Sequence, residues 1–236
     1  MVTGRSDNSM SLRKMFERIS PRYDILNRIL TFGLDKHWRS EAAKSCLADS
    51  PRMVLDLCCG TGDLLSSIRG KAPSGTRIMG ADFSEAMISR ASSRAGDAYS
   101  LLIADAGHLP FHGESFDCVA TAFSFRNLLY KNPELRGYLS EILRILKPGG
   151  SFVIVETSQP EPEVLRRIFH GYVKNVVPTI GAAVSGSKGA YSYLARSAIN
   201  FPPPEEVGAI LRETGFSDVR FEPLLLGTVA IHKARK

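Results

Sequence analysis

Residues 54–63 constrain the fold of this 236-residue chain more than any other segment. A short apolar run ends in the turn Gly60-Thr61-Gly62, and a stretch with helical apolar spacing begins at Leu64. This order predicts a strand, a tight turn and a helix. Because glycine lets a backbone approach a ligand closely, such a turn is typical of a nucleoside-binding site.

A second apolar run, residues 78–81, ends at Asp82, twenty residues after Gly62. An acid at this distance can accept hydrogen bonds from the two hydroxyls of a ribose. Residues 63–65 contain no third glycine, which the fingerprint of a dinucleotide-binding site would have there. The pattern therefore favours a smaller nucleoside cofactor without a pyrophosphate.

Composition restricts the class of protein. Hydrophobic residues make up 44% of the chain and charged residues 23%, as in ordinary globular proteins. We expect one domain over residues 11–236, preceded by a flexible tail at residues 1–10. No apolar run approaches the ~18–20 residues of a membrane span, and the N-terminus has no apolar signal core. The expected location is therefore cytoplasmic.

The charge and the metal-binding residue types indicate few specific partners. A net charge of +6 allows attraction to an anionic membrane or to nucleic acid. No arginine-rich run, zinc spacing or RNA-binding aromatic motif accompanies it, so we expect no specific nucleic acid partner. The four cysteines and five histidines lack ligand spacing, which predicts reduced thiols and no metal site. The sequence leaves a homodimer open.

From residue 53 onward, predicted strands and helices alternate, which favours an α/β fold with a mostly parallel sheet and helices on both faces. Residues 11–48 are predicted as a helical cap. The segment 157–203 is expected to be helical at first and then irregular, as an inserted lid or substrate-binding segment. Seven strands are expected near 53–57, 77–81, 100–104, 116–122, 151–156, 218–222 and 225–232, the last two as an antiparallel pair. Helices are expected near 62–69, 84–94, 134–146, 163–176 and 204–214.

Three acids end three successive predicted strands: Asp56, Asp82 and Asp105. The carboxyl ends of strands in an open parallel sheet face the crevice where ligands bind. Asp82 can bind a ribose, Asp105 can accept from the exocyclic amine of adenine, and Asp56 or Asp63 can face an ammonium group. The alternative for Asp82 is a helix N-cap, because Ser84 and a predicted helix follow it.

Phe83 and Met87 flank Asp82 and can sandwich a flat adenine ring. A role in the core fits Met87 equally well, because it shares an apolar face with Ile88 and Ala91.

Several motifs resemble those of class I S-adenosylmethionine-dependent methyltransferases. They are Cys59-Gly60-Thr61-Gly62-Asp63, Asp82-Phe83-Ser84 with Met87, Asp105-Ala106 with Leu109-Pro110-Phe111, Ser115-Phe116-Asp117 and Leu146-Lys147-Pro148-Gly149-Gly150. Others look like those of the ubiquinone/menaquinone biosynthesis C-methyltransferases. They are Tyr23-Asp24 with Asn27, Phe32-Gly33 with Trp38, Phe125-Arg126-Asn127, Glu156 with Ser158 and Pro160, Tyr191 with Tyr193-Leu194 and Ser197, and the C-terminal run from Phe201 to His232. This resemblance extends from about Met15 to the C-terminus.

The resemblance implies a Rossmann-like methyltransferase with an N-terminal helical extension and S-adenosyl-L-methionine as its cofactor. The cofactor contacts it implies are Thr61, Asp82, Asp105 and Ala106. A further contact in the family, usually a serine, is Ala122 here, so a hydroxyl is absent at that point, and the sequence leaves open whether Ser124 replaces it. Asp35 stands where close relatives often have a histidine.

The implied reaction is C-methylation of a reduced, polyprenylated quinol, either demethylmenaquinol or the equivalent ubiquinol precursor. Ionising a phenol with a pKa near 10 at pH 7 requires roughly 4 kcal/mol. Arg126 is the candidate that holds the oxyanion, and a salt bridge to a neighbouring helix is its alternative role. Asn127 or Tyr23 would orient it, and a water held by Tyr23 or Asp24 would accept the proton.

Apolar positions within residues 164–184, beside Arg166, Arg167 and Lys174, favour an amphipathic helix for peripheral membrane contact. A helix that covers the domain with a solvated outer face is the alternative. For the whole chain, three other functions are weighed: a methyltransferase for another small-molecule or nucleic-acid acceptor, a dinucleotide-dependent oxidoreductase, and a non-catalytic binding module.

Overall fold

The computed structural model describes residues 7–96 and 98–236. The strands are β1 (Met53–Leu57), β2 (Arg77–Asp82), β3 (Ser100–Ile103), β4 (Phe116–Ala122), β5 (Leu146–Thr157), β6 (Ser217–Leu224) and β7 (Val229–Arg235). The helices are α1 (Asp7–Ile19), α2 (Tyr23–Leu30), α3 (Asp35–Leu47), α4 (Asp63–Arg69), α5 (Glu85–Ala95), α6 (Phe125–Leu129), α7 (Leu135–Ile145), α8 (Glu163–Ser185), α9 (Lys188–Ile199) and α10 (Pro204–Thr214). Two short 3-10 helices are η1 (Ser20–Arg22) and η2 (Leu225–Gly227).

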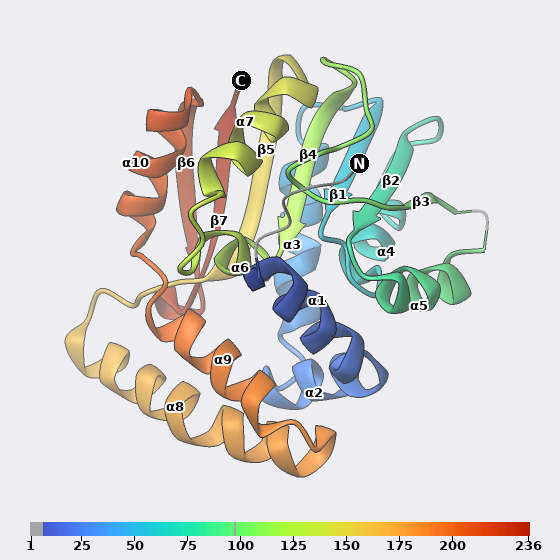
Figure 1. Cartoon of the computed structure of the whole chain (residues 1–236). Coiled ribbons are helices and arrows are strands. Elements are labelled where there is room, and N and C mark those ends of the chain that lie inside the picture. The colour runs from blue at the N-terminus through green and yellow to red at the C-terminus, as the bar shows by residue number, and fades with distance from the viewer. Residues whose placement is uncertain (1–6, 97) are drawn as a thin grey trace.

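Within the described residues, seven strands form one sheet in the order β3-β2-β1-β4-β5-β7-β6 (Figure 1). Strands β1 to β5 are parallel, and β7 is antiparallel to both of its neighbours. The predicted α/β sheet with an antiparallel closing pair is confirmed. Because parallel strands end on the same side, the carboxyl ends of β1 to β4 lie together.

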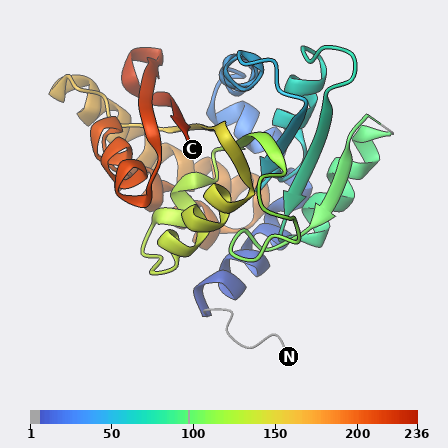
Figure 2. The same cartoon turned by 90° about the horizontal axis from the view of Figure 1, so that it is seen from above.

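Helices cover both faces of the sheet, as predicted (Figure 2). On one face, α3 and α4 bury Trp38 and Leu65 in a cluster with Val54 and Cys118. On the other face, α7 and α10 bury Ile142 and Leu211 in a cluster with side chains of β1 and β4. These two clusters form the core, since each strand alternates its side chains between them.

Four other helices, α1, α2, α8 and α9, lie beyond the carboxyl ends of the parallel strands (Figure 1). A third apolar cluster joins them, in which Ile19 and Leu26 pack with Tyr191 and Leu194. Helices from the N-terminal part of the chain and from the segment between β5 and α10 therefore lie together over the sheet edge where ligands bind in this fold class.

The predicted flexible tail at residues 1–10 is too long, because α1 begins at Asp7. Residues 1–6 lie outside the described residues. The four cysteines are free thiols. No helix in the described part of the chain has both the length and the apolarity that crossing a membrane requires.

The prediction of an irregular second half for residues 157–203 is wrong. Helix α8 continues to Ser185, turns at Gly186 with a φ of 71°, and α9 returns as an antiparallel partner. The glycine-rich stretch suggested a break, but Gly181 lies inside α8 for a packing reason. A Cβ atom on Gly181 would lie 2.1 Å from Cγ of Tyr191 in α9.

Two predicted strand boundaries are also wrong. Strand β5 begins at Leu146 rather than 151, because the Lys-Pro-Gly-Gly segment forms an irregular start where the pairing with β4 shifts. Strand β7 begins at Val229 rather than 225, and the apolar residues Leu225 and Leu226 belong to the η2 turn. Apolarity alone indicated a strand there, although the chain needs a turn between antiparallel strands.

The contact between Gly181 and Tyr191 generates a matched test of the α8–α9 packing. Gly181→Ala should lower the free energy of unfolding by about 3 kcal/mol, and Tm by roughly 6–12 °C, because the added methyl group forces the helices apart. Gly171 lies in the same helix, and a Cβ atom at position 171 would meet no other atom within 4 Å, so Gly171→Ala is the matched control. It should raise stability by up to about 1 kcal/mol through helix propensity. Equal melting temperatures for the two variants in calorimetry would contradict this packing.

Candidate functional site

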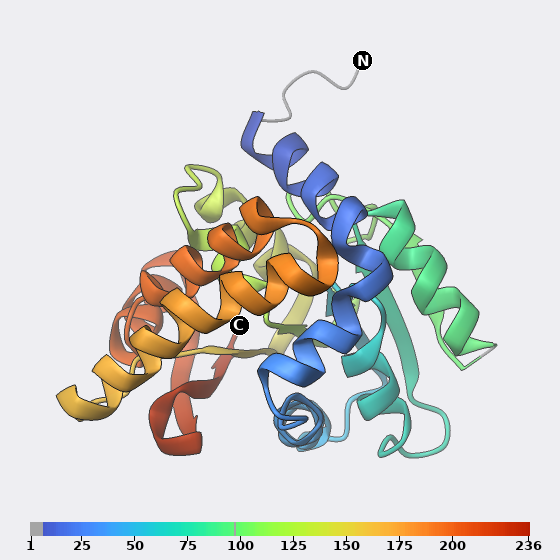
Figure 3. The ribbon, with the colours of Figure 1, turned by 90° about the horizontal axis from the view of Figure 1, so that it is seen from below.

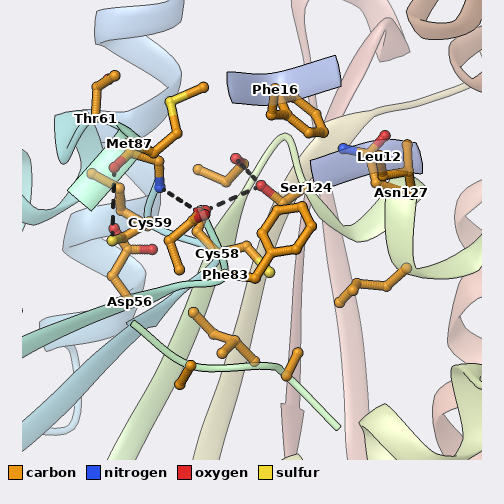
Figure 4. A pocket seen from close by; sticks show the side chains of 18 of the residues that line it. Leu12, Phe16, Asp56, Cys58, Cys59, Thr61, Phe83, Met87, Ser124 and Asn127 are labelled. Carbon is orange, nitrogen blue, oxygen red and sulfur yellow. Dashed lines mark hydrogen bonds between the residues drawn. The ribbon is translucent and has the colours of Figure 1, made fainter. Parts of the chain in front are cut away.

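A pocket at the carboxyl ends of β1 to β4, called here the strand-end pocket, is lined by residues from the loops that follow these strands (Figure 4). Nine predicted cofactor residues line it: Asp56, Gly60, Thr61, Asp82, Phe83, Met87, Asp105, Ala106 and Ala122. The tenth, Gly62, does not. It precedes α4 with a φ of 86°, and its Cβ would lie 3.2 Å from Oη of Tyr99. Gly62 is therefore a turn and packing residue.

Asp82 lies at the end of β2 with two backbone donors already in place. Its Oδ2 accepts from the N–H of Gly60 at 2.9 Å, and its Oδ1 accepts from the N–H of Ser84 at 2.9 Å. Burial raises the pKa of Asp82 to about 6, although these backbone donors act in the opposite sense. The N-cap of α5 is Ser84, whose hydroxyl accepts from the N–H of Met87. Each oxygen of Asp82 keeps a lone pair for a ribose hydroxyl.

Asp56 is buried at the end of β1, and neither of its side-chain oxygens has a hydrogen-bond partner among the described residues. Burial raises the pKa of Asp56 well above its usual value, and the charge of Arg39 opposes this. A buried carboxylate without a donor is uncommon and indicates a missing partner. A ligand that carries an ammonium group would supply it.

The strand-end pocket is acidic although the chain has a net charge of +6. Four carboxylates line it against one guanidinium, that of Arg39; they belong to Asp56, Asp63, Asp82 and Asp105. S-adenosylmethionine carries a sulfonium and an ammonium group together with a ribose and an adenine. The residues present therefore fit this cofactor in charge and in hydrogen-bonding groups.

The three residues predicted to contact adenine, Asp105, Phe83 and Met87, all line the pocket. Oδ1 of Asp105 accepts from the N–H of Gly107 at 2.9 Å, which fixes the carboxylate next to Ala106. Phe83 is half-buried and Met87 is almost fully buried, and both reach the pocket surface. Ser124 also lines the pocket, so a hydroxyl is present near Ala122.

The N-terminal helices close the strand-end pocket. Leu12, Phe16 and Tyr23 line it. The ring of Phe16 packs edge-on against that of Phe83, with 6.4 Å between the two ring centres (Figure 4). The sequence alone does not identify Leu12 and Phe16 as pocket residues, because they look like part of an ordinary apolar helix face. Only the fold brings this face over strands that begin more than thirty residues later.

Asp24 lines neither the strand-end pocket nor the apolar pocket that adjoins it. Its Oδ1 accepts from Oγ1 of Thr61 at 2.6 Å, and its other oxygen is paired with Arg94. The structure therefore does not bring Asp24 to the substrate side, where it was predicted to hold a water. It connects α2 to the glycine turn and to α5.

A second pocket, called here the helical pocket, lies between α2, α3, α8, α9 and η2. It is lined mainly by apolar and aromatic side chains, and it shares Tyr23 and Arg39 with the strand-end pocket. The two pockets therefore adjoin. Several residues of the quinone-enzyme motifs meet in it: Phe32, Trp38, Arg126, Tyr191 and Leu194.

Arg126 lines the helical pocket and is almost fully buried. Its Nη1 lies 2.5 Å from Oε1 of Glu156, and its backbone N–H donates to Oε2 of the same residue. The ion pair is to strand β5, not to a neighbouring helix. Burial alone would lower the pKa of Arg126, but the charge of Glu156 outweighs it and the pKa is raised.

Unpartnered polar atoms lie in both pockets. Among the described residues, Nε of Arg126 and Oη of Tyr191 have no hydrogen-bond partner on the helical side, and Oδ1 of Asn127 has none on the strand-end side. Buried polar atoms are normally satisfied, so each of these pocket residues has hydrogen-bonding capacity that the protein itself does not use.

A second buried ion pair lies in the helical pocket. Arg39 donates to Oδ2 of Asp35 at 2.8 Å, and the hydroxyl of Thr31 donates to Oδ1 of Asp35 at 3.1 Å. The guanidinium of Arg39 also lies 5.1 Å from the ring centre of Phe123. The helical pocket thus has two polar centres, Arg126 and the Asp35–Arg39 pair, in an apolar wall. In the described part of the chain, no three His, Cys, Asp or Glu side chains gather as metal ligands.

The fold has solved counterparts with different reactions. A methyltransferase of Haloferax volcanii, solved with its Trm112 activator, matches with a TM-score of 0.61 and 21% identity over 92% of this chain and 96% of that one. A [4+2]-cyclase, SpnF, matches with a TM-score of 0.60 and 15% identity over 95% and 94% of the two chains. At these identities the matches show the fold alone.

Relatives found by sequence identify the family, which the solved structures do not. The demethylmenaquinone methyltransferase of Deinococcus radiodurans is 41% identical over 96% of this chain and 92% of its own length. That of Thermus thermophilus is 41% identical over 92% and 98% of the two chains. The ubiquinone/menaquinone biosynthesis C-methyltransferase UbiE of Geobacter sulfurreducens is 39% identical over 95% and 88%. The model of the ubiE/COQ5 methyltransferase family matches residues 4–236, so this chain belongs to that family.

Proposed function

We propose that this enzyme transfers a methyl group from S-adenosylmethionine to a ring carbon of a reduced, polyprenylated quinone, with demethylmenaquinol as the substrate. The observation that carries this proposal is the adjoining pair of pockets. One is acidic and suited to a cationic nucleoside, and the other is apolar with polar centres at Arg126 and Asp35–Arg39. Two of the relatives cited above carry the name demethylmenaquinone methyltransferase, which favours a naphthoquinol over a benzoquinol.

S-adenosylmethionine, when bound, supplies a methyl group that a carbon nucleophile can take. The residues of the helical pocket make that nucleophile by stabilising a phenolate, since the neutral quinol carbon reacts poorly. The unpartnered Nε of Arg126 can donate to the oxyanion while Glu156 holds the guanidinium in place. One charged hydrogen bond contributes about 1.5–3 kcal/mol, less than the roughly 4 kcal/mol needed. A second donor is therefore required. Tyr23, which lines both pockets, is the candidate for this role, because Asn127 lines only the strand-end pocket.

The proton acceptor in this proposal is a water held by Tyr23. Asp24 does not take this role, because Thr61 and Arg94 engage the carboxylate of Asp24. The surrounding apolar wall excludes other water and strengthens the field of Arg126. A homodimer stays an open possibility, and the role of residues 157–203 as a lid or substrate-binding insertion stays a prediction. The oxidoreductase, binding-module and nucleic-acid alternatives are not favoured by the family or by the apolar second pocket.

The reaction itself can be tested with the purified protein, methyl-labelled cofactor and prenylated demethylnaphthoquinol kept reduced under nitrogen. We expect label in the lipid-extractable naphthoquinone. The matched oxidised quinone should accept almost none, since it has no phenol to ionise. A parallel reaction with a benzoquinol precursor tests the ring preference. Transfer of label to RNA or protein, but not to either quinol, would contradict the proposal.

Cofactor affinity should depend on pH through Asp82. With a pKa of about 6, its carboxylate is mostly protonated at pH 5 and mostly ionised at pH 7. Only the ionised form accepts both ribose hydroxyls, so binding of S-adenosylhomocysteine in calorimetry should tighten up to about tenfold per pH unit below pH 6 and then level off.

The matched variants are Asp82→Asn and Asp49→Asn. Asp82→Asn should bind about 10- to 100-fold more weakly at pH 7 and lose the pH dependence centred near 6. Asp49 pairs with Lys233 and Arg235 at the surface, so its variant should bind like the unchanged chain. If Asp82→Asn kept the full pH dependence, another group would be responsible.

Arg126 can be tested without leaving an isolated buried charge. The double variant Arg126→Gln/Glu156→Gln keeps a neutral hydrogen-bonded pair in place of the ion pair. It should lower kcat for quinol methylation about 10- to 150-fold and leave cofactor affinity within about twofold, because Arg126 does not line the strand-end pocket. The deficit should shrink as the pH rises toward the phenol pKa, near 10. An equal deficit at every pH would argue for a purely structural role.

A further inference from the structure

Helix α2 carries large apolar side chains on its outer face as well as on its inner face. Leu26 is fully buried, whereas Ile25 is 60% exposed and Ile29 is 46% exposed. Phe32, in the loop that follows, is 81% exposed. The spacing of Ile25 and Ile29 places their side chains on one face of α2, and Phe32 follows two residues after the helix ends. Nothing in the described part of the chain covers this side.

A second exposed apolar segment comes from the far end of the sequence. In the η2 turn, Leu225 is 49% exposed and Leu226 is 75% exposed. Their φ angles are 44° and 56°, and that of Phe32 is 53°. Left-handed backbone is unfavourable for such side chains and is usually left to glycine or asparagine. These residues therefore combine backbone strain with exposure of apolar surface, and neither helps the fold by itself.

These two segments meet at the opening of the helical pocket. Phe32, Leu34 and Leu225 line that pocket and are exposed to solvent as well. In the view from below, α2 and the β6–β7 connection lie on the side of the molecule away from the start of α1 (Figure 3). We call the exposed set the apolar rim; it comprises Ile25, Ile29, Phe32, Leu34, Leu225 and Leu226.

The charges beside α2 are positive. Arg28 and Lys36 are exposed, and within the described residues neither forms an ion pair. The acids of the same stretch are turned inward, since Asp24 pairs with Arg94 and Asp35 with Arg39. A strained, apolar edge flanked by free cations fits the boundary between the headgroups and the acyl chains of an anionic bilayer.

We propose that the apolar rim docks this enzyme on an anionic lipid bilayer, with the helical pocket opening toward the acyl chains. This rests on the proposed function, since a polyprenylated quinol resides in the bilayer and would pass into the pocket with its tail still in lipid. It also replaces α8 as the membrane contact predicted from the sequence. Phe169, Val173 and Val177 of α8 pack against α9 and line the pocket, so this apolar face is internal.

The test is flotation of the full chain with vesicles of phosphatidylglycerol and phosphatidylcholine, without quinol. The unchanged chain should float with these vesicles. It should not float with them in high salt, and it should not float with vesicles made of phosphatidylcholine alone. The variant Ile25→Ser/Ile29→Ser/Leu226→Asn should lose at least about tenfold in the vesicle-bound fraction. None of these three residues lines either pocket, and asparagine tolerates the left-handed backbone at 226.

Two matched variants identify the surface. Ile103→Ser changes a side chain that is 48% exposed on β3, an edge strand of the sheet, and should float like the unchanged chain. Val164→Ser/Ile168→Ser changes the exposed start of α8 and should also float. If the α8 variant were released and the rim variant were not, or if the unchanged chain failed to float, the proposal would be overturned.

Turnover separates this proposal from the function on which it rests. The rim variant should methylate a short-chain, water-soluble quinol at the same rate as the unchanged chain. Its rate on a long-chain quinol in vesicles should fall about as much as its vesicle binding. Methylation of both quinols at unchanged rates by the rim variant would overturn the docking proposal and leave the function intact. Flotation of the unchanged chain without methylation of any quinol would overturn the function.

Discussion

Both pockets depend on the contact that holds the N-terminal helices against the carboxyl ends of the strands. The strands alone form only one wall of each pocket, since Phe16 and Tyr23 close the strand-end pocket and Trp38 lines the helical one. The hydrogen bond from Thr61 to Asp24 fixes α2 to the glycine turn. Apolar side chains of α1 and α2 also pack against Tyr191 and Leu194 of α9. A buried polar link of this kind adds little net stability, but it sets the position of the helices.

The two buried ion pairs are better understood as parts of the site than as sources of stability. Removing a carboxylate and a guanidinium from water costs several kcal/mol per ion, which their mutual attraction offsets only with good geometry. Arg126 and Glu156 achieve that geometry through a backbone donor as well as the guanidinium. This pairing leaves the buried Nε of Arg126 without a hydrogen-bond partner among the described residues, in a wall that is mainly apolar. A donor held in this way needs no reorganisation when negative charge develops beside it.

Local patterns were enough to predict the sheet and the strand-end residues. Gly60 and the acids Asp56 and Asp82 stand at strand ends that the alternation of strands and helices determines, so their convergence follows from the topology. The errors come from residues whose role depends on distant partners. Gly181 resembled a helix breaker because Tyr191, which needs the space, lies in another helix. The apolar pair Leu225–Leu226 resembled a strand because an exposed apolar turn is rare in a fold stabilised by burial.

The substrate class is determined by what surrounds the sheet. A [4+2]-cyclase shares this fold at a TM-score of 0.60, so the sheet and its strand-end crevice do not select a reaction. Most of the helical pocket's lining comes from α2, α3, α8, α9 and the α2–α3 loop, and α6 and η2 add Arg126 and Leu225. These are the segments in which the quinone-enzyme motifs around Phe32 and Tyr191 occur. The N-terminal helices, the α8–α9 insertion and η2 thus add apolar surface around a fixed cation beside the cofactor crevice, which fits a lipophilic ring.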